Sequence, residues 1–134
     1  MSDATEVCAA VINRGGRVLL ATRRKGVHLE GCWEFPGGKV EEKESLSECI
    51  RRELREELGL NIQEVSFLFR RIYAYPGKKI ALNFMFCILD KEQVAVGKEA
   101  QRVGWFTWSE AELLNLASAD RAYFNEVHEK TPME

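Results

Sequence analysis

The sequence predicts an α/β sandwich of the α+β kind, in which helices cover a mixed β-sheet. Segments rich in β-branched and aromatic residues come before and after one strongly amphipathic segment, and two further helical segments lie near the C-terminus. This order differs from the regular alternation of strands and helices in a βαβ array. The 134 residues, of which 46% are hydrophobic and 30% charged, are expected to form a single domain over residues 1–134.

Two β-hairpins are predicted. The first joins residues 7–12 to residues 18–21 through the turn sequence NRGG. The second joins residues 62–75 to residues 79–89, both rich in β-branched and aromatic side chains, through the turn sequence PGK. Residues 102–108 fit a further strand.

Residues 45–58 are the strongest helix candidate. Ser45 and Glu48 have the spacing of a capping box, and Gly59 is placed to end the helix. The glycine-rich and aromatic residues 25–39 before it are typical of a loop that crosses a site. Two more helices are expected, over residues 109–116 and 119–130.

Composition excludes several classes of function. A net charge of -2 argues against a stable nucleic-acid partner, and two histidines argue against a histidine-based metal centre. No apolar run is long enough to span a membrane, and the N-terminus lacks the basic region of a signal peptide, so a cytoplasmic location is expected. The four cysteines lack zinc-site spacing, and three of them lie in apolar segments where core packing is expected, at Cys8, Cys49 and Cys87.

Acidic residues lie on an unexpected face of the helix at 45–58. At about 100° per residue, its apolar residues form a stripe roughly 120° wide. Glu53 lies about 20° outside this stripe and Glu57 lies within it, whereas the arginines lie on the far side. A carboxylate taken out of water needs a strong partner, so we expect a hard divalent cation, Mg²⁺ or Mn²⁺, held by oxygen ligands. A structural ion-pair network is the alternative, and Glu56, rotated away, could bind a second ion or face water.

The segment FPGGK supports a cation site, since its adjacent glycines allow close approach of the backbone and a carbonyl there could point at the same ion. Lys39 could neutralise a phosphate, although a loop lysine is often simply solvated.

At this point the chain resembles a known family. Residues 38–60, GKVEEKESLSECIRRELREELGL, fit the Nudix signature at every specified position, and the segments GCWEFPGGK and GKEAQ resemble its MutT-like branch. The resemblance implies a Nudix-type α/β/α sandwich with a loop-helix-loop motif. It also implies hydrolysis of a nucleoside diphosphate linked to another group; in the MutT branch, a nucleoside triphosphate yields the monophosphate and pyrophosphate.

The resemblance also assigns roles to residues. The Mg²⁺ ligands and catalytic groups would be Glu53, Glu56, Glu57 and Glu99, together with the carbonyl of Gly37 as a metal ligand. Glu99 would be the general base, although without the family it is simply an exposed loop residue. The structural residues of the motif would be Gly38, Glu44, Arg52 and Gly59. Phosphate contacts fall to Arg24 and Lys39, with Arg24 preferred over Arg23, which is expected on the opposite strand face.

The sequence defines less well which nucleobase the protein recognises. Asp120 holds the place where MutT-like proteins read the base edge, but it could equally cap the last helix. Phe35 or Trp33 could stack on the base or belong to the core, and Lys78 stands where some members carry arginine. We expect 8-oxo-dGTP first and CTP, dCTP or 5-methyl-dCTP second. The alternatives are another nucleoside diphosphate derivative as substrate, or a nucleotide-sensing module without turnover. The chain is expected to act as a monomer or homodimer.

Overall fold

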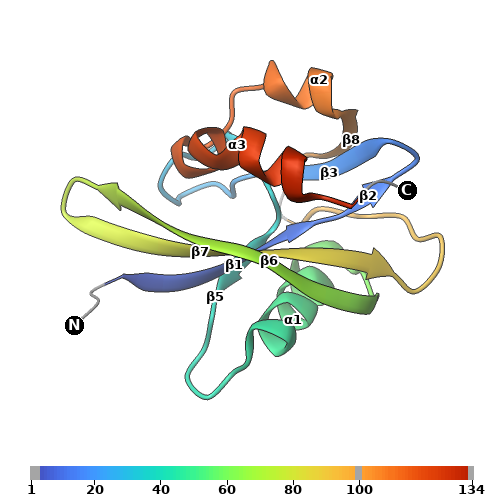
Figure 1. Cartoon of the computed structure of the whole chain (residues 1–134), viewed down its shortest axis with the longest axis horizontal. Coiled ribbons are helices and arrows are strands. Elements are labelled where there is room, and N and C mark those ends of the chain that lie inside the picture. The colour runs from blue at the N-terminus through green and yellow to red at the C-terminus, as the bar shows by residue number, and fades with distance from the viewer. Residues whose placement is uncertain (1–3, 99–100, 133–134) are drawn as a thin grey trace.

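The computed structural model describes residues 4–98 and 101–132, which form two four-stranded sheets and three helices (Figure 1). The first sheet has the order β5-β1-β7-β6, with β1 at Thr5–Val11, β5 at Gly37–Lys39, β6 at Ile62–Tyr75 and β7 at Lys78–Leu89. The second contains β2 at Asn13–Arg14, β3 at Arg17–Thr22, β4 at Trp33–Glu34 and β8 at Val103–Thr107. The helices are α1 at Leu46–Leu58, α2 at Trp108–Glu112 and α3 at Ser118–Lys130.

The first sheet is mixed, as predicted, because β1 runs parallel to β7 but antiparallel to β5. Helix α1 lies on one side of the strands, and α2 and α3 lie on the other (Figure 1). Side chains alternate between these two sides along each strand, so Cys8 and Ala10 face the core under α1 while Ala9 and Val11 face the core under α3. The result is the expected α/β/α sandwich.

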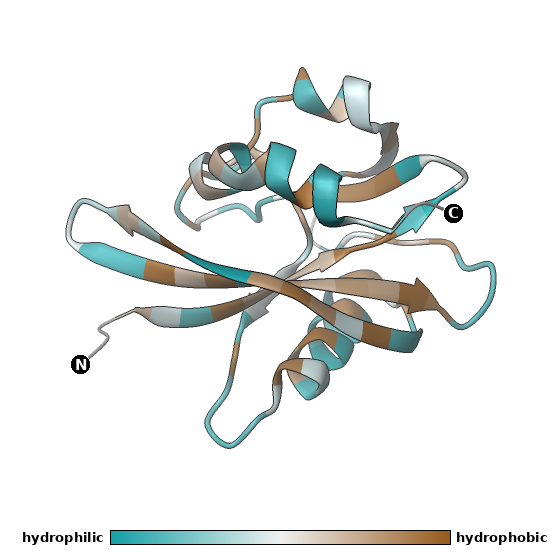
Figure 2. Ribbon diagram, viewed as in Figure 1, coloured by the Kyte–Doolittle hydropathy of each residue, from teal (hydrophilic) through white to brown (hydrophobic). Residues whose placement is uncertain are grey.

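Hydrophobic residues follow this layering (Figure 2). They gather along the central strands, while the loop before α1 and the β6–β7 turn are hydrophilic. Within residues 4–98 and 101–132, none of the helices combines the length and apolar character that crossing a membrane requires.

The predicted first hairpin is wrong in its pairing. Strand β1 joins the first sheet, and the chain passes to the second sheet at Ile12. Of the predicted hairpin, the structure keeps the hydrogen bond from Leu19 N to the Ile12 carbonyl and the pairing of β2 with β3 across the turn at Gly15 and Gly16. Hydrophobic pattern alone locates strands but does not choose their partners, which the parallel contact with β7 decides here. The second hairpin is confirmed, with a two-residue turn whose Gly77 has φ +81°.

Helix α1 begins and ends as predicted: Ser45 and Glu48 form the capping box, and Gly59 has φ +68°. Helix α2 is shorter than expected and starts one residue earlier, because Thr107 caps it instead of Ser109. The expected loop over residues 25–39 also contains two short strands, β4 and β5.

Candidate active site

The Glu53 carboxylate lies directly against β5. A Cβ atom added to Gly38 would lie 2.3 Å from Glu53 Oε2, so only glycine leaves room for the carboxylate at this place. A side chain is equally excluded at Gly37, because an added Cβ atom would lie 1.9 Å from the Cys8 carbonyl oxygen of β1. The two glycines therefore let α1 and β1 approach β5 closely from opposite sides.

The backbone of β5 presents a carbonyl on its outer edge. The Pro36 carbonyl accepts a hydrogen bond from Ala10 N in β1 (2.7 Å), and the Lys39 carbonyl accepts one from Arg52 Nη2 in α1 (3.0 Å). Because carbonyl directions alternate along a strand, the Gly37 carbonyl points away from β1, like that of Lys39.

Arg52 connects the loop before α1 to the acidic face of the helix. Its Nε and Nη2 donate to the two oxygens of Glu44 at 2.6 and 2.9 Å, and its Nη1 donates to Glu53 Oε1 at 2.7 Å. The hydrogen bonds from Arg52 lower the pKa of Glu44 to about 2. The expectation that the arginines cannot reach Glu53 is therefore wrong for Arg52, whose long side chain folds back along the helix. Glu56 is exposed, as its position on the helix predicts, and lies 3.4 Å from Arg52 Nη1.

Glu57 is mostly buried and, among the described residues, makes no ion pair within 4.0 Å. Burial, together with the negative charges of Glu34 and Glu53, raises its pKa to about 7. Gln101 Nε2 donates a hydrogen bond to Glu57 Oε1 at 2.7 Å, which opposes this increase. Glu57 therefore lies where a cation would be strongly favoured.

The structure adds Glu34 and Arg23 to this site. Arg23 Nη1 lies 2.8 Å from Glu34 Oε1, and burial, together with the charge of Asp120, raises the pKa of Glu34 to about 7. Arg23 is the more buried of the two arginines, and the charge of the exposed Arg24 also lowers the pKa of Glu34 and Glu57. An acidic residue between Trp33 and Phe35 was the one signal in the sequence that could have marked Glu34.

Asp120 does not cap α3. The cap position belongs to Ala117, and Asp120 Oδ2 accepts a hydrogen bond from Phe35 N at 3.0 Å. Burial raises the pKa of Asp120 to about 7. The Phe35 ring belongs to the core, where it contacts Phe84 and Phe124, so only the backbone of Phe35 faces Asp120.

The remaining predicted residues belong to neighbouring strands and loops. Arg24, Lys39 and Lys78 are exposed, and Lys78 Nζ lies 5.5 Å from the centre of the Tyr75 ring. Trp33 is half-buried and packs edge-on against Phe106. Glu99 lies outside the described residues.

The donor chemistry of this centre fits a hard divalent cation. Within the described residues, no three acidic, histidine or cysteine side chains converge as a complete metal-binding group. The available donors are nevertheless all oxygens: the carboxylates of Glu53 and Glu57 and the outward carbonyl of Gly37. Such a set, with one carboxylate desolvated and unpaired, suits Mg²⁺ or Mn²⁺ and not zinc.

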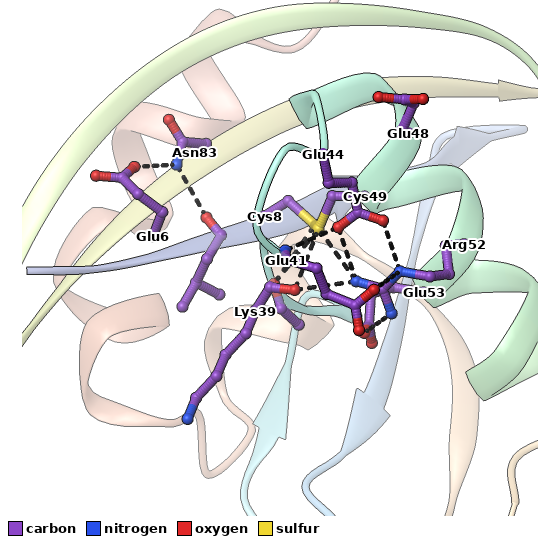
Figure 3. Close-up of a disulfide and its surroundings, with 12 residues drawn as sticks. Glu6, Cys8, Lys39, Glu41, Glu44, Glu48, Cys49, Arg52, Glu53 and Asn83 are labelled. Atoms are coloured by element: carbon purple, nitrogen blue, oxygen red, sulfur yellow. Dashed lines mark hydrogen bonds and ion pairs between the residues drawn. A yellow bond between two sulfur atoms is a disulfide. The ribbon is translucent and has the colours of Figure 1, made fainter.

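A disulfide lies behind the site (Figure 3). Cys8 in β1 and Cys49 in α1 are both fully buried, as predicted, but they are joined to each other, which the expectation of separate core cysteines did not include. Cys8 Sγ lies 3.5 Å from the Gly38 carbonyl oxygen, and Cys49 Sγ lies 3.6 Å from that of Lys39. The disulfide therefore ties α1 to β1 underneath the glycines of β5.

Comparison with known proteins agrees with this geometry. The chain is 33% identical over 99 residues to an 8-oxo-dGTP diphosphatase of Proteus vulgaris, covering 73% of this chain and 88% of that protein. It is 37% identical over 115 residues to a CTP pyrophosphohydrolase of Escherichia coli, covering 86% and 84%. A crystal structure of a MutT Nudix hydrolase from Burkholderia pseudomallei superimposes with a TM-score of 0.82 at 27% identity, covering 94% of this chain and 99% of that one.

The NUDIX domain model matches residues 3–127, which include the complete signature, both glycines of β5 and the acidic face of α1. The chain is therefore a hydrolase of the Nudix family, of the MutT-like type.

Proposed function

We propose that the protein is a Mg²⁺-dependent nucleoside triphosphate pyrophosphohydrolase, which converts a nucleoside triphosphate and water to the monophosphate and pyrophosphate. Glu53 and Glu57 carry this proposal, because the Glu53 carboxylate lies against Gly38 of β5 and the charges of Glu53 and Glu34 both act on the buried Glu57 carboxyl. We place its action in the cytoplasm, on the nucleotide pool, with 8-oxo-dGTP as the first substrate.

The cation would be held by the carboxylates of Glu53, Glu56 and Glu57 and by the Gly37 carbonyl, with Glu99 nearby. When bound, Mg²⁺ neutralises phosphate charge and lowers the pKa of water toward neutrality, and Mn²⁺ can substitute for it. The raised pKa of Glu57 supports this assignment, since a carboxylate that is costly to ionise alone gains most from a cation.

Side chains of the protein would transfer the proton and contact the phosphates. Glu99 would accept the proton of the attacking water as general base. The exposed cations Arg24 and Lys39 would contact the phosphates, and their positive charges would stabilise the negative charge that develops on the leaving pyrophosphate. Arg52 is not available for this role, because Glu44 and Glu53 already occupy its guanidinium.

Asp120 and Phe35 support recognition of a base at the other end of the acidic centre. Asp120 is buried and held by Phe35 N, and an ionised carboxylate accepts hydrogen bonds from N1-H and the 2-amino group of a guanine. The same acceptor suits the 4-amino group of cytosine, so CTP and modified cytosine nucleotides are the second candidate. The relatives named as 8-oxo-dGTP diphosphatase and CTP pyrophosphohydrolase support both. Lys78 is placed near the β6–β7 turn, where it would contact the same ligand from outside.

A pyrophosphate-release screen over normal, oxidised and methylated nucleotides, compared by kcat/KM, tests this proposal. Glu57→Gln is expected to abolish Mg²⁺-dependent turnover while the circular dichroism spectrum stays that of the wild type, and near-normal rates would remove Glu57 from the site.

Asp120→Ala should raise KM for the true substrate alone; an equal effect on every triphosphate would exclude Asp120 as the base-reading residue. Tight nucleotide binding without any turnover would instead indicate a sensing module.

A further inference from the structure

Gln101 joins two elements of the site through one carboxamide. Its Nε2 donates to Glu57 Oε1 in α1 at 2.7 Å and to the Thr22 carbonyl at the end of β3 at 2.8 Å. The residue is only 9% exposed. Both hydrogens of the amide nitrogen are therefore used, one on each element.

The orientation of this carboxamide is fixed by its neighbours. Both partners are acceptors, so the nitrogen must face them; the rotated amide would place Oε1 against a carboxylate and a carbonyl. The backbone of the next residue is also fixed, because Arg102 N donates to Thr22 Oγ1 and Thr22 N donates to the Arg102 carbonyl, both at 2.9 Å. Gln101 thus extends toward Glu57 from a rigid base.

The other end of the carboxamide is the oxygen atom Oε1. Gln101 Oε1 is buried and, among residues 4–98 and 101–132, accepts no hydrogen bond. An acceptor left unpaired at this depth destabilises the protein. Such an atom beside a carboxylate site is expected where a ligand supplies the donor, and a hydrated cation carries several.

The Glu57 carboxylate requires a group that holds it in one orientation. The charges that act on it are those of the acidic Glu34 and Glu53, which repel its ionised form, and that of the exposed Arg24, which attracts it; the two repulsions would turn an unrestrained carboxylate away from Glu34 and Glu53. Gln101 is the neutral group that holds Glu57 Oε1 in place against this repulsion.

We propose that Gln101 is a positioning residue, which fixes the orientation of the Glu57 carboxylate for divalent-cation binding. The proposal rests on the proposed function, because it assumes that Glu57 is a cation ligand. Partners that orient a metal ligand in this way typically change metal affinity by about 10–100-fold when they are removed.

Titration of the full-length protein with Mn²⁺, followed by loss of the electron paramagnetic resonance signal of the free ion, tests this without any turnover. Gln101→Met keeps the length of the side chain and removes its donor, and should raise the Kd for Mn²⁺ by about tenfold or more. Gln101→Leu serves as a second variant should the methionine prevent folding.

Asn83 provides the matched control. It is also a buried amide, and its Nδ2 donates to a carboxylate, Glu6 Oε1, at 3.0 Å and to a backbone carbonyl, that of Val7, at 3.1 Å (Figure 3). Asn83→Leu should lower the melting temperature like Gln101→Met but leave the Kd for Mn²⁺ unchanged. Equal loss of Mn²⁺ affinity in both variants would mean that Gln101 acts only through stability, and would overturn the proposal.

The same titration in a Glu57→Gln background separates this proposal from the function on which it rests. If Gln101 acts through Glu57, adding Gln101→Met to Glu57→Gln should change the Kd less than twofold. A full tenfold effect in that background would overturn the positioning role while leaving the cation site intact. If Glu57→Gln alone binds Mn²⁺ as tightly as the wild type, the cation site itself is refuted, and the role of Gln101 with it.

Discussion

Phe35 N donates a buried hydrogen bond to Asp120 Oδ2, at 3.0 Å, across 85 residues of sequence. The bond joins the segment between β4 and β5 to the first turn of α3, and so closes the side of the site opposite to α1. Because the carboxyl is fully buried, its ionised form is disfavoured and its pKa is raised to about 7. The contact therefore couples the stability of the fold to pH.

Asp120→Asn tests this coupling. The folded protein holds the Asp120 proton more tightly than the unfolded chain does, so the contribution of this carboxyl to stability is greatest below pH 4 and is lost as the pH rises through about 7. Asparagine keeps an acceptor for Phe35 N and carries no charge. The variant should be more stable than the wild type at pH 8, by on the order of 2 kcal/mol, and similar at pH 4. Urea unfolding with EDTA at both pH values measures this, and a difference that does not change with pH would contradict it.

The two glycines of β5 should respond differently to alanine. In Gly38→Ala the new Cβ meets the end of the Glu53 side chain, which can rotate away, so the fold should survive while the carboxylate is displaced. We expect roughly a 100-fold lower kcat/KM with a small change in melting temperature. In Gly37→Ala the Cβ meets the Cys8 carbonyl of β1, and backbone cannot rotate away.

Gly37→Ala should therefore lower the melting temperature far more than Gly38→Ala does. Thermal unfolding of the two variants, with kcat/KM measured below both transitions, separates these effects. Equal destabilisation by the two substitutions would show that the Glu53 carboxylate does not lie against Gly38.

Glu44→Gln removes the ion pair with Arg52 and is expected to destabilise the protein near neutral pH. The pKa of Glu44 is lowered to about 2, so its contribution to stability is fully present above about 4.5 and is lost as the pH falls through 2. The gap between variant and wild type should thus close in acid. Thermal scans at pH 7 and pH 3 measure it, with Glu42→Gln, an exposed residue of the same loop, as the control. A gap that grows in acid would exclude the ion pair as its origin.

How far the sequence alone predicts this site depends on the range of the interactions. Helix α1 and its caps depend on contacts three or four residues apart, so Ser45, Glu48 and Gly59 could be located in advance. Helical projection likewise predicted correctly that Glu53 and Glu57 lie beside the core stripe. It failed for Arg52, because projection places Cα–Cβ directions and not the end of a long side chain.

Local sequence patterns do not predict the longer-range contacts of the site. Glu34, Gln101 and the disulfide from Cys8 to Cys49 each depend on segments brought together by strand pairing or by the packing of α1 on the sheet. The same limit produced the wrong partner for β1, because the parallel contact with β7 joins segments that no local pattern links.

The disulfide between Cys8 and Cys49 provides the last prediction. It closes a loop with a sequence separation of 41, which in the chain-entropy description stabilises the fold by about 4 kcal/mol. Because disulfides are rare in reducing compartments, the proposed action in the cytoplasm requires that the protein keep its fold and activity when the pair is reduced. Addition of a dithiol reductant should therefore lower the melting temperature without abolishing pyrophosphate release below the transition.

Cys8→Ala/Cys49→Ala should have the lower melting temperature at the outset and show no further response to the reductant, while Cys32→Ser should respond like the wild type. If the wild type has the same melting temperature with and without reductant, the two cysteines contribute as separate core residues, as their apolar surroundings first predicted.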